Sequence, residues 1–99
     1  MPYDLDLHCC DSTGNHVYFS NKVGANGKIN LERVSQSGAE GTEALTATIK
    51  HRVHQHHHKH VKVSLEINDK MIKLKLFVIY SYTYYSIKWI DAIGLSLHL

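Results

Sequence analysis

Cysteine is scarce in this 99-residue chain, and its two cysteines stand next to each other as Cys9 and Cys10. Neighbouring residues in a strand point to opposite faces of a sheet, so these two cannot readily form a bridge with each other. A secreted domain held together by disulfides needs more cysteines at wider spacings. The sequence therefore predicts two thiols that are buried or unreactive, in a reducing compartment.

Long apolar runs and export signals are also lacking. The first ten residues carry acids where a signal peptide carries bases, and they have no apolar centre. The apolar run from Ile72 to Tyr80 is interrupted by Lys73 and Lys75 and is far shorter than the about 20 residues of a membrane-spanning helix. We expect a soluble protein without a membrane partner, folded as a single domain over residues 1–99.

The motifs of common catalytic sites are missing too. The chain has no GxSxG, no HExxH and no glycine-rich phosphate loop. Cys9 is close in sequence to His8 and His16, but a short hairpin produces such proximity without any catalytic role. We therefore expect no enzyme, no catalytic residue and no cofactor.

Acidic residues are absent from one long stretch of the chain. None lies between Glu43 and Glu66, whereas the basic residues gather from Lys50 to Lys75, although the formal net charge is only +2. This asymmetry favours an anionic partner for the second half of the chain.

Alternating apolar and polar residues predict six strands, over residues 3–9, 17–19, 28–34, 46–53, 60–67 and 71–82. The strands 46–53 and 60–67 would form a tight central hairpin with one apolar and one polar face. On the polar face, hydroxyl and cationic side chains suited to phosphates and bases form the predicted RNA-binding set: Thr46, Thr48, Lys50, Arg52, His60, Lys62 and Ser64. For stacking on an unpaired base, the candidate aromatics are Tyr80, Tyr82, Tyr84 and Tyr85.

From about Tyr84 the apolar period changes. Ile87, Ile90, Ile93 and Leu97 recur at steps of three and four residues, which predicts a C-terminal helix of roughly 10–14 residues. The expected fold class is α+β: an N-terminal hairpin, an antiparallel meander sheet and this helix. One helix cannot cover the apolar back of so wide a sheet, so we expect an interlocked homodimer. Its interface would contain Trp89, Ile90 and Ile93.

A histidine tract lies between the two strands of the central hairpin: His51, His54, His56, His57, His58 and His60. Imidazoles bind metal ions readily, but a specific site needs three or four ligands in fixed geometry with supporting groups behind them. No carboxylate is near in sequence, so we expect no physiological metal site. The tract would instead contact phosphate when protonated, or be a solvated hairpin tip.

Two segments carry a resemblance to a known family: GKINLERVSQSGAEGTEALTATIKHR and KHVKVSLEIND, followed by a strand and a segment containing IDAI. Over residues 15–93 the chain resembles the coat proteins of small single-stranded RNA bacteriophages. The resemblance implies a five-stranded sheet and a helical C-terminus in two interlocked subunits. It also implies a capsid whose interior sheet face binds genomic RNA and represses translation through an RNA hairpin. The family's RNA-facing positions match Thr46, Thr48, Lys50, His60, Lys62 and Ser64.

The sequence thus predicts a viral coat protein that dimerises, assembles into an icosahedral shell and holds single-stranded RNA. It would be found in the virion, after assembly in the cytoplasm of a bacterial host. The alternative is a small non-viral module that binds nucleic acid or metal through the histidine-rich hairpin.

Overall fold

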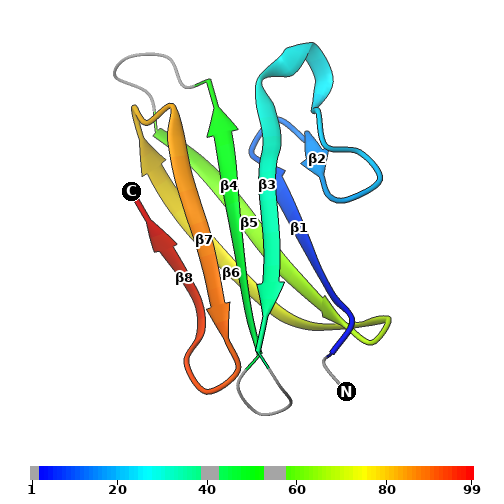
Figure 1. Cartoon of the computed structure of the whole chain (residues 1–99). Coiled ribbons are helices and arrows are strands. Elements are labelled where there is room, and N and C mark those ends of the chain that lie inside the picture. The colour runs from blue at the N-terminus through cyan, green and yellow to red at the C-terminus, as the bar shows by residue number, and fades with distance from the viewer. Residues whose placement is uncertain (1–2, 39–42, 53–57) are drawn as a thin grey trace.

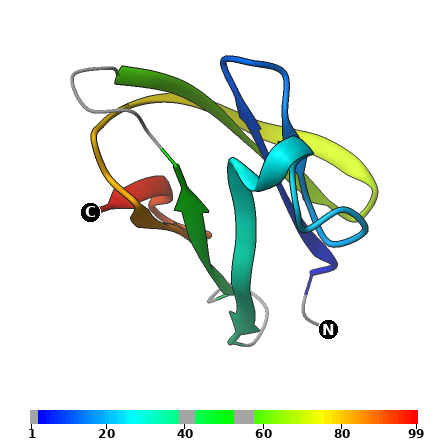
Figure 2. The same ribbon diagram turned by 90° about the horizontal axis from the view of Figure 1, so that it is seen from above.

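The computed structural model describes residues 3–38, 43–52 and 58–99. These residues form two four-stranded antiparallel sheets, which pack face to face as a β-sandwich (Figures 1 and 2). Sheet I has the strand order β2-β1-β5-β6, and sheet II has the order β3-β4-β7-β8. The strands are β1 (Leu5–Asp11), β2 (His16–Val17), β3 (Ile29–Ser37), β4 (Ala44–His51), β5 (His58–Ile67), β6 (Lys70–Tyr80), β7 (Tyr84–Ile90) and β8 (Gly94–His98).

Consecutive hairpins alternate between the two sheets. The pairs β1–β2 and β5–β6 belong to sheet I, whereas β3–β4 and β7–β8 belong to sheet II. Each sheet is completed by one pairing between strands far apart in the chain, β1 with β5 and β4 with β7. Every sheet therefore combines an early and a late hairpin.

The core fills the space between the sheets, because each strand turns its apolar residues inward. Two facing sheets pack in this way when alternate side chains of both are apolar. The buried side chains of sheet I are Leu5, Leu7, Cys9, Val17, Val61, Val63, Leu65 and Ile79. Those of sheet II are Ile29, Leu31, Leu45, Ala47, Ile49, Tyr85, Ile87, Trp89 and Leu95.

The prediction of strands in the first 80 residues is confirmed in position, since β1, β3, β4, β5 and β6 all overlap predicted strands. The expected turn after residue 67 is present as well. Asn68 and Asp69 have φ of 50° and 65°, the backbone of a two-residue hairpin connection between β5 and β6.

The prediction of a C-terminal helix is wrong. Residues 84–98 form the hairpin β7–β8, and the described residues contain no helix beyond the three-residue 3-10 turn η1 (Ala25–Gly27). In β7, Tyr85, Ile87 and Trp89 alternate with partly exposed residues, so the true period is two. A three-residue turn follows, and it ends at Gly94, whose φ of 88° suits glycine.

The α+β fold class and the meander are therefore corrected to an all-β sandwich. The strands β4 and β5 were expected to pair, but β4 pairs with β3 and β7 while β5 pairs with β1 and β6. Their apolar faces meet across the core, so each sheet covers the other. This arrangement removes the reason for an interlocked second copy to complete the core. No helix in the described part of the chain has the length and apolarity to cross a membrane.

Candidate nucleic-acid interface

The structure divides the predicted RNA-binding residues between two opposite surfaces. Thr46, Thr48 and Lys50 lie on the outer face of β4 in sheet II, and Arg52 is exposed just after this strand. The other three residues, His60, Lys62 and Ser64, lie on the outer face of β5 in sheet I. The single cationic hairpin face expected from the sequence is therefore not formed.

The outer face of sheet II gathers the β4 residues with polar side chains from its neighbours. The ladder pairings align them in rows across the sheet. One row is Arg33, Thr48, Ser86 and His98; the next is Ser35, Thr46, Lys88 and Ser96; a third is Asn30, Lys50 and Tyr84. We call these eleven residues the basic face. Neighbouring rows are about 7 Å apart and neighbouring strands about 4.8 Å apart, so the face is a regular polar grid.

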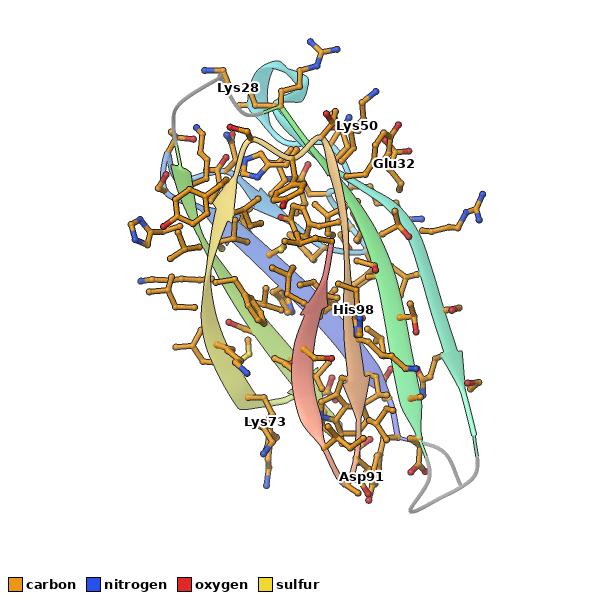
Figure 3. All side chains as sticks on the ribbon, turned by 90° about the vertical axis from the view of Figure 1, so that its left-hand side faces the viewer. Lys28, Glu32, Lys50, Lys73, Asp91 and His98 are labelled. Carbon is orange, nitrogen blue, oxygen red and sulfur yellow. The ribbon has the colours of Figure 1, made fainter. Side chains whose placement is uncertain are left out.

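The basic face carries a net positive charge. Arg33, Lys50 and Lys88 contribute three permanent positive charges on three different strands, and none of its eleven residues is acidic. An acid next to the face is Glu32, the extra residue at the β-bulge of β3 before Arg33, which is exposed at the edge of the sheet. Glu32 and Lys50 project from the same end of sheet II in Figure 3. The face thus keeps a net positive charge beside this one carboxylate.

An aromatic ring and a shallow hollow complete the basic face. The ring of Tyr84 is half exposed, and the Lys50 ammonium lies 5.6 Å from its centroid. A hollow of about 230 Å³ opens beside the ring and is lined by Thr48, Tyr84, Tyr85, Ser86, His98 and Leu99. The Ser96 hydroxyl donates a hydrogen bond to the Lys88 carbonyl oxygen at 3.2 Å, which fixes one neighbouring polar group. The face therefore offers a ring for stacking next to cations and hydroxyls.

Among the four candidate tyrosines, only the placement of Tyr84 combines exposure with the basic face. Tyr85 is 2% exposed because it points into the core, so it cannot stack on a base. Tyr80 and Tyr82 are exposed at the end of β6 and in the connection after it.

The β5 residues line a different surface. A hollow of about 520 Å³ on the outer face of sheet I is lined by Cys10, Asp11, Ser12, Gly14, His60, Lys62 and Leu76. It combines one lysine and one histidine with an apolar side chain from β6. Toward the other end of the same face, Asp6 and Glu66 stand opposite each other on β1 and β5. This face is therefore of mixed charge, unlike the basic face.

The predicted dimer-interface residues occupy three different environments. Trp89 is 1% exposed and packs in the core of its own sandwich, which differs from the placement at a partner surface expected from the sequence. Ile90 is half-buried on the outer face of β7, and Ile93 is 72% exposed in the β7–β8 turn. This difference has the same cause as the wrong prediction of a helix: Trp89 is one of the alternate side chains of strand β7 that point into the core.

Three members of the histidine tract, His54, His56 and His57, lie outside the described residues. The hairpin tip on which the alternative metal-binding module depends lies outside them as well. The described end members separate, with His51 buried in the core and His60 on the outer face of sheet I. Over residues 3–38, 43–52 and 58–99, no group of three or more His, Cys, Asp or Glu side chains is arranged to hold a metal ion.

Cys9 and its histidine neighbours point in opposite directions. His8 and His16 lie on the outer face of sheet I, where their ring nitrogens are 2.9 Å apart and His8 Nε2 is 3.1 Å from Glu66 Oε1. Cys9 faces the core, with its Sγ 4.0 Å from the Tyr85 hydroxyl. Burial raises the pKa of the Cys9 thiol to about 12. The geometry therefore forms no thiolate–imidazole pair here.

A polar cluster is buried at one end of the core. The Asp11 carboxylate accepts hydrogen bonds from the backbone N–H groups of Thr13 and Asn15, the Thr13 hydroxyl and the Asn15 amide, at 2.7–3.0 Å. Burial alone would raise the pKa of Asp11, but these bonds outweigh it and hold the pKa below its usual value. His51 lies against this carboxylate, and burial lowers the pKa of its imidazole. The Asp11 carboxylate and the His51 imidazole are closed to solvent, whereas Thr13 at the outer side of the cluster is exposed.

Sequence reasoning missed most of the basic face. Arg33, Lys88, Ser96 and His98 were not among the predicted site residues, because their neighbours in the sheet depend on which strands pair. One signal was present for β7: Tyr84, Ser86 and Lys88 alternate with Tyr85, Ile87 and Trp89, which is typical of a strand with one polar face.

Comparison of the chain with protein-family models, with curated proteins and with solved structures gave no match. The resemblance to phage coat proteins therefore has no support from these comparisons, and the helices that it implied for the C-terminus are not formed. The shell, the virion location and the translational repression stay predictions.

Proposed function

We propose that the protein binds single-stranded RNA on the basic face of sheet II. The observation that carries this proposal is the grid of three cations, hydroxyls and one exposed tyrosine on a sheet surface whose eleven residues include no acid. Lysine and arginine neutralise phosphates, and serine and threonine hydroxyls donate to phosphate or base oxygens.

Single-stranded RNA fits this face better than a duplex. Unpaired bases expose their rings, so a surface aromatic such as Tyr84 can stack on them, whereas the bases of a duplex are already stacked. Lys50 and Lys88 lie one strand and two rows apart, about 14 Å, with Arg33 beside them. This span accommodates a short run of extended nucleotides with phosphates near the cations and one base near the ring.

The affinity should be modest and salt-dependent. Each phosphate contact on a single strand changes the slope of log K against log salt by about 0.7, so three cations predict a slope of about −2. Removing Lys50 or Lys88 should reduce the slope by about 0.7 and weaken binding several-fold.

Fluorescence anisotropy with a labelled oligouridine, repeated over a series of salt concentrations, tests the proposal. The variants are Lys50→Ala and Lys88→Ala, with Lys22→Ala as a charge-matched control from the exposed connection between β2 and β3. Lys22→Ala should keep the wild-type slope. Tyr84→Ala should weaken binding without changing the slope, because it removes a stacking ring and no charge. Tyr84→Phe should retain binding, because it keeps the ring.

Lys62→Ala distinguishes the two sheet faces. Since Lys62 projects from sheet I, its removal should leave the slope unchanged. If Lys62→Ala makes the salt dependence of binding shallower and Lys50→Ala does not, RNA binds the outer face of β5 and the proposal is overturned. No binding at low salt, or equal binding of the wild type to duplex and single-stranded RNA, would also contradict it.

A further inference from the structure

Strand β6 exposes an apolar stripe at the edge of sheet I. It has 11 residues and pairs only with β5 in the strand order of that sheet, so no described strand occupies its other edge. Its outward side chains include Leu74, Leu76 and Val78, which are 68%, 54% and 39% exposed. Met71, Ile72 and Tyr80 extend the exposed apolar surface to both ends of the strand. Figure 3 looks onto this side of the sandwich, with β6 and β8 toward the viewer.

The stripe is unusually large for a monomer of this size. The exposed fractions of its six side chains correspond to roughly 600 Å² of surface, the upper end of the range for the largest apolar patch of monomeric proteins. A standard protein interface buries about 800 Å² per partner, and the weakest stable ones about 600 Å². A long, apolar edge strand is also a template for strand addition. Pairing at the edge covers only the sides of these side chains that face the second strand, so backbone hydrogen bonds along the open edge supply the rest of the contact.

We propose that β6 pairs antiparallel with β6 of a second copy of this chain, about a two-fold axis at Leu76, so that the two copies of sheet I form one eight-stranded sheet. Leu76 then lies opposite Leu76 of the second copy, and Leu74 lies opposite Val78. The ladder places apolar side chains against apolar side chains along the stripe, which is the favourable cross-strand pairing.

The lysines and the length of β6 together select this register: the lysines disfavour an axis at Lys75 or Leu74, and an axis at Leu76 pairs residues 72–80 whereas one at Phe77 pairs only residues 74–80. Lys73 and Lys75 lie on the other face of the strand from the stripe, opposite Leu65 and Val63 of β5. Pairing about Leu76 sets Lys75 opposite Phe77 of the second copy, and Lys73 opposite Ile79. A shift of the axis to Lys75 would oppose the two copies of Lys75, and a shift to Leu74 would oppose Lys73 and Lys75. Like charges directly opposite each other destabilise a ladder.

The lysines leave room for the second strand at this edge. Lys75 is turned toward sheet II, where its ammonium donates a hydrogen bond to the Leu95 carbonyl oxygen at 3.2 Å. Lys73 projects away from the end of β6 in Figure 3. A two-fold contact uses the same edge on both copies, so the assembly closes at two. A second copy suits the strand better than a foreign strand, because β6 is complementary to itself in this register.

The oligomeric state tests the proposal without RNA, so its outcome is independent of the proposed function. Sedimentation velocity across the micromolar range should show a monomer that converts to a dimer and no larger species. Leu76→Lys places two charges on the axis and should leave the protein monomeric at every concentration. Ile93→Lys is the matched control, as it replaces an exposed isoleucine of the β7–β8 turn and should dimerise like the wild type.

Cross-linking tests the register even if Leu76→Lys fails to fold. In a Cys10→Ser background, Leu76→Cys should form an intermolecular disulfide on mild oxidation, because its α-carbon lies within about 5.5 Å of its counterpart. Leu74→Cys should not, since its counterpart is about 14 Å away along the strands. A wild type that stays monomeric, a Leu76→Lys variant that dimerises, loss of the dimer in Ile93→Lys, open-ended oligomers, or cross-linking at Leu74→Cys alone would each overturn the proposal.

Discussion

The Nε2 atom of His51 lies 3.4 Å from Oδ2 of Asp11, and neither side chain has any exposed surface. Asp11 ends β1 in sheet I and His51 ends β4 in sheet II, so the pair joins the two layers inside the core. At this distance the two groups are in contact but do not form a well-made hydrogen bond. Neither ring nitrogen of His51 has a hydrogen-bond partner among the described residues. The imidazole is thus held between two apolar faces with one anionic neighbour.

This burial predicts a loss of stability in mild acid. Burial lowers the pKa of His51 in the folded protein, although Asp11 opposes the shift. As pH falls through the unfolded pKa of about 6.5, the unfolded chain binds a proton that the folded chain does not, so the free energy of unfolding decreases. One such group contributes at most about 1.4 kcal/mol per pH unit. Urea unfolding near neutral pH and near pH 5.5 measures the decrease.

The comparison variant for this prediction is His51→Gln, which should be less stable at neutral pH but lose less on acidification. His16, whose pKa burial also lowers, retains its own share of the effect in both proteins. If His51→Gln loses as much stability on acidification as the wild type, another group is responsible for the pH dependence.

The position of Trp89 predicts a large effect on folding. Trp89→Ala removes the largest buried side chain of the core and should lower the free energy of unfolding by about 3–5 kcal/mol. Ile93→Ala, in the exposed turn a few residues later, should change it by less than about 0.5 kcal/mol. Urea unfolding followed by tryptophan-independent circular dichroism checks both. Similar losses in the two variants would contradict the inward placement of Trp89.

The β5–β6 turn predicts a stabilising substitution. Asp69 has a φ of 65°, which a residue with a side chain adopts at a cost, and Asn-Gly is the preferred pair for this turn. Asp69→Gly should therefore raise the free energy of unfolding by about 0.5–1 kcal/mol.

Asn68 in the same turn should respond in the opposite direction. Its side-chain oxygen accepts a hydrogen bond from the Asp4 N–H at 3.0 Å, which ties the turn to the start of the chain. Asn68→Ala should lower stability by about 1 kcal/mol. Thermal unfolding of both variants checks the pair, and a lower midpoint for Asp69→Gly would show that the turn does not carry the expected strain.

The two adjacent thiols should differ in reactivity. Cys9 is 1% exposed and burial raises its pKa to about 12, whereas Cys10 is half-buried on the outer face with a pKa raised by burial and by Asp11. An aromatic disulfide reagent should titrate one thiol slowly in the native protein and both in denaturant. Cys10→Ser should leave no reactive thiol until the protein unfolds. A fast native reaction in that variant would contradict the inward orientation of Cys9.

Local alternation was sufficient to locate most strands but not to pair them. Val61, Val63 and Leu65 alternate with polar residues in any sheet that has one buried face, so the pattern alone marks β5. Whether β4 lies beside β5 or across the core from it depends on the connection and on the apolar faces available elsewhere. This placement depends on contacts between residues far apart in the chain. It determines the sheet topology, and it separates the residues of the predicted hairpin face onto two sheets.

The C-terminal segment shows how two periods can coexist. Ile87, Ile90 and Ile93 have helical spacing, but Tyr85, Ile87 and Trp89 have strand spacing and include the largest side chains. Those large side chains became the core, while Ile93 ended in a turn. Strand alternation alone predicted part of the candidate site, because it places Thr46, Thr48 and Lys50 on one polar strand face. Arg33 and Lys88 could not be added from the sequence, because they join this face only through the pairing of β4 with β3 and β7.

The alternation of hairpins between the layers also constrains how the chain reaches its native state. β1 can form its long pairing only when β5 is available, and β4, which already pairs with β3, gains its second neighbour only when β7 is available. Contacts of such sequence separation slow folding, which for sandwiches of this kind takes milliseconds to seconds. On the ribosome, neither layer can be assembled before the third hairpin emerges, so the growing chain carries unpaired strand edges for most of its synthesis. The β6 edge, at which we propose that a second copy pairs, is synthesised late, after β1 and β5 can already meet.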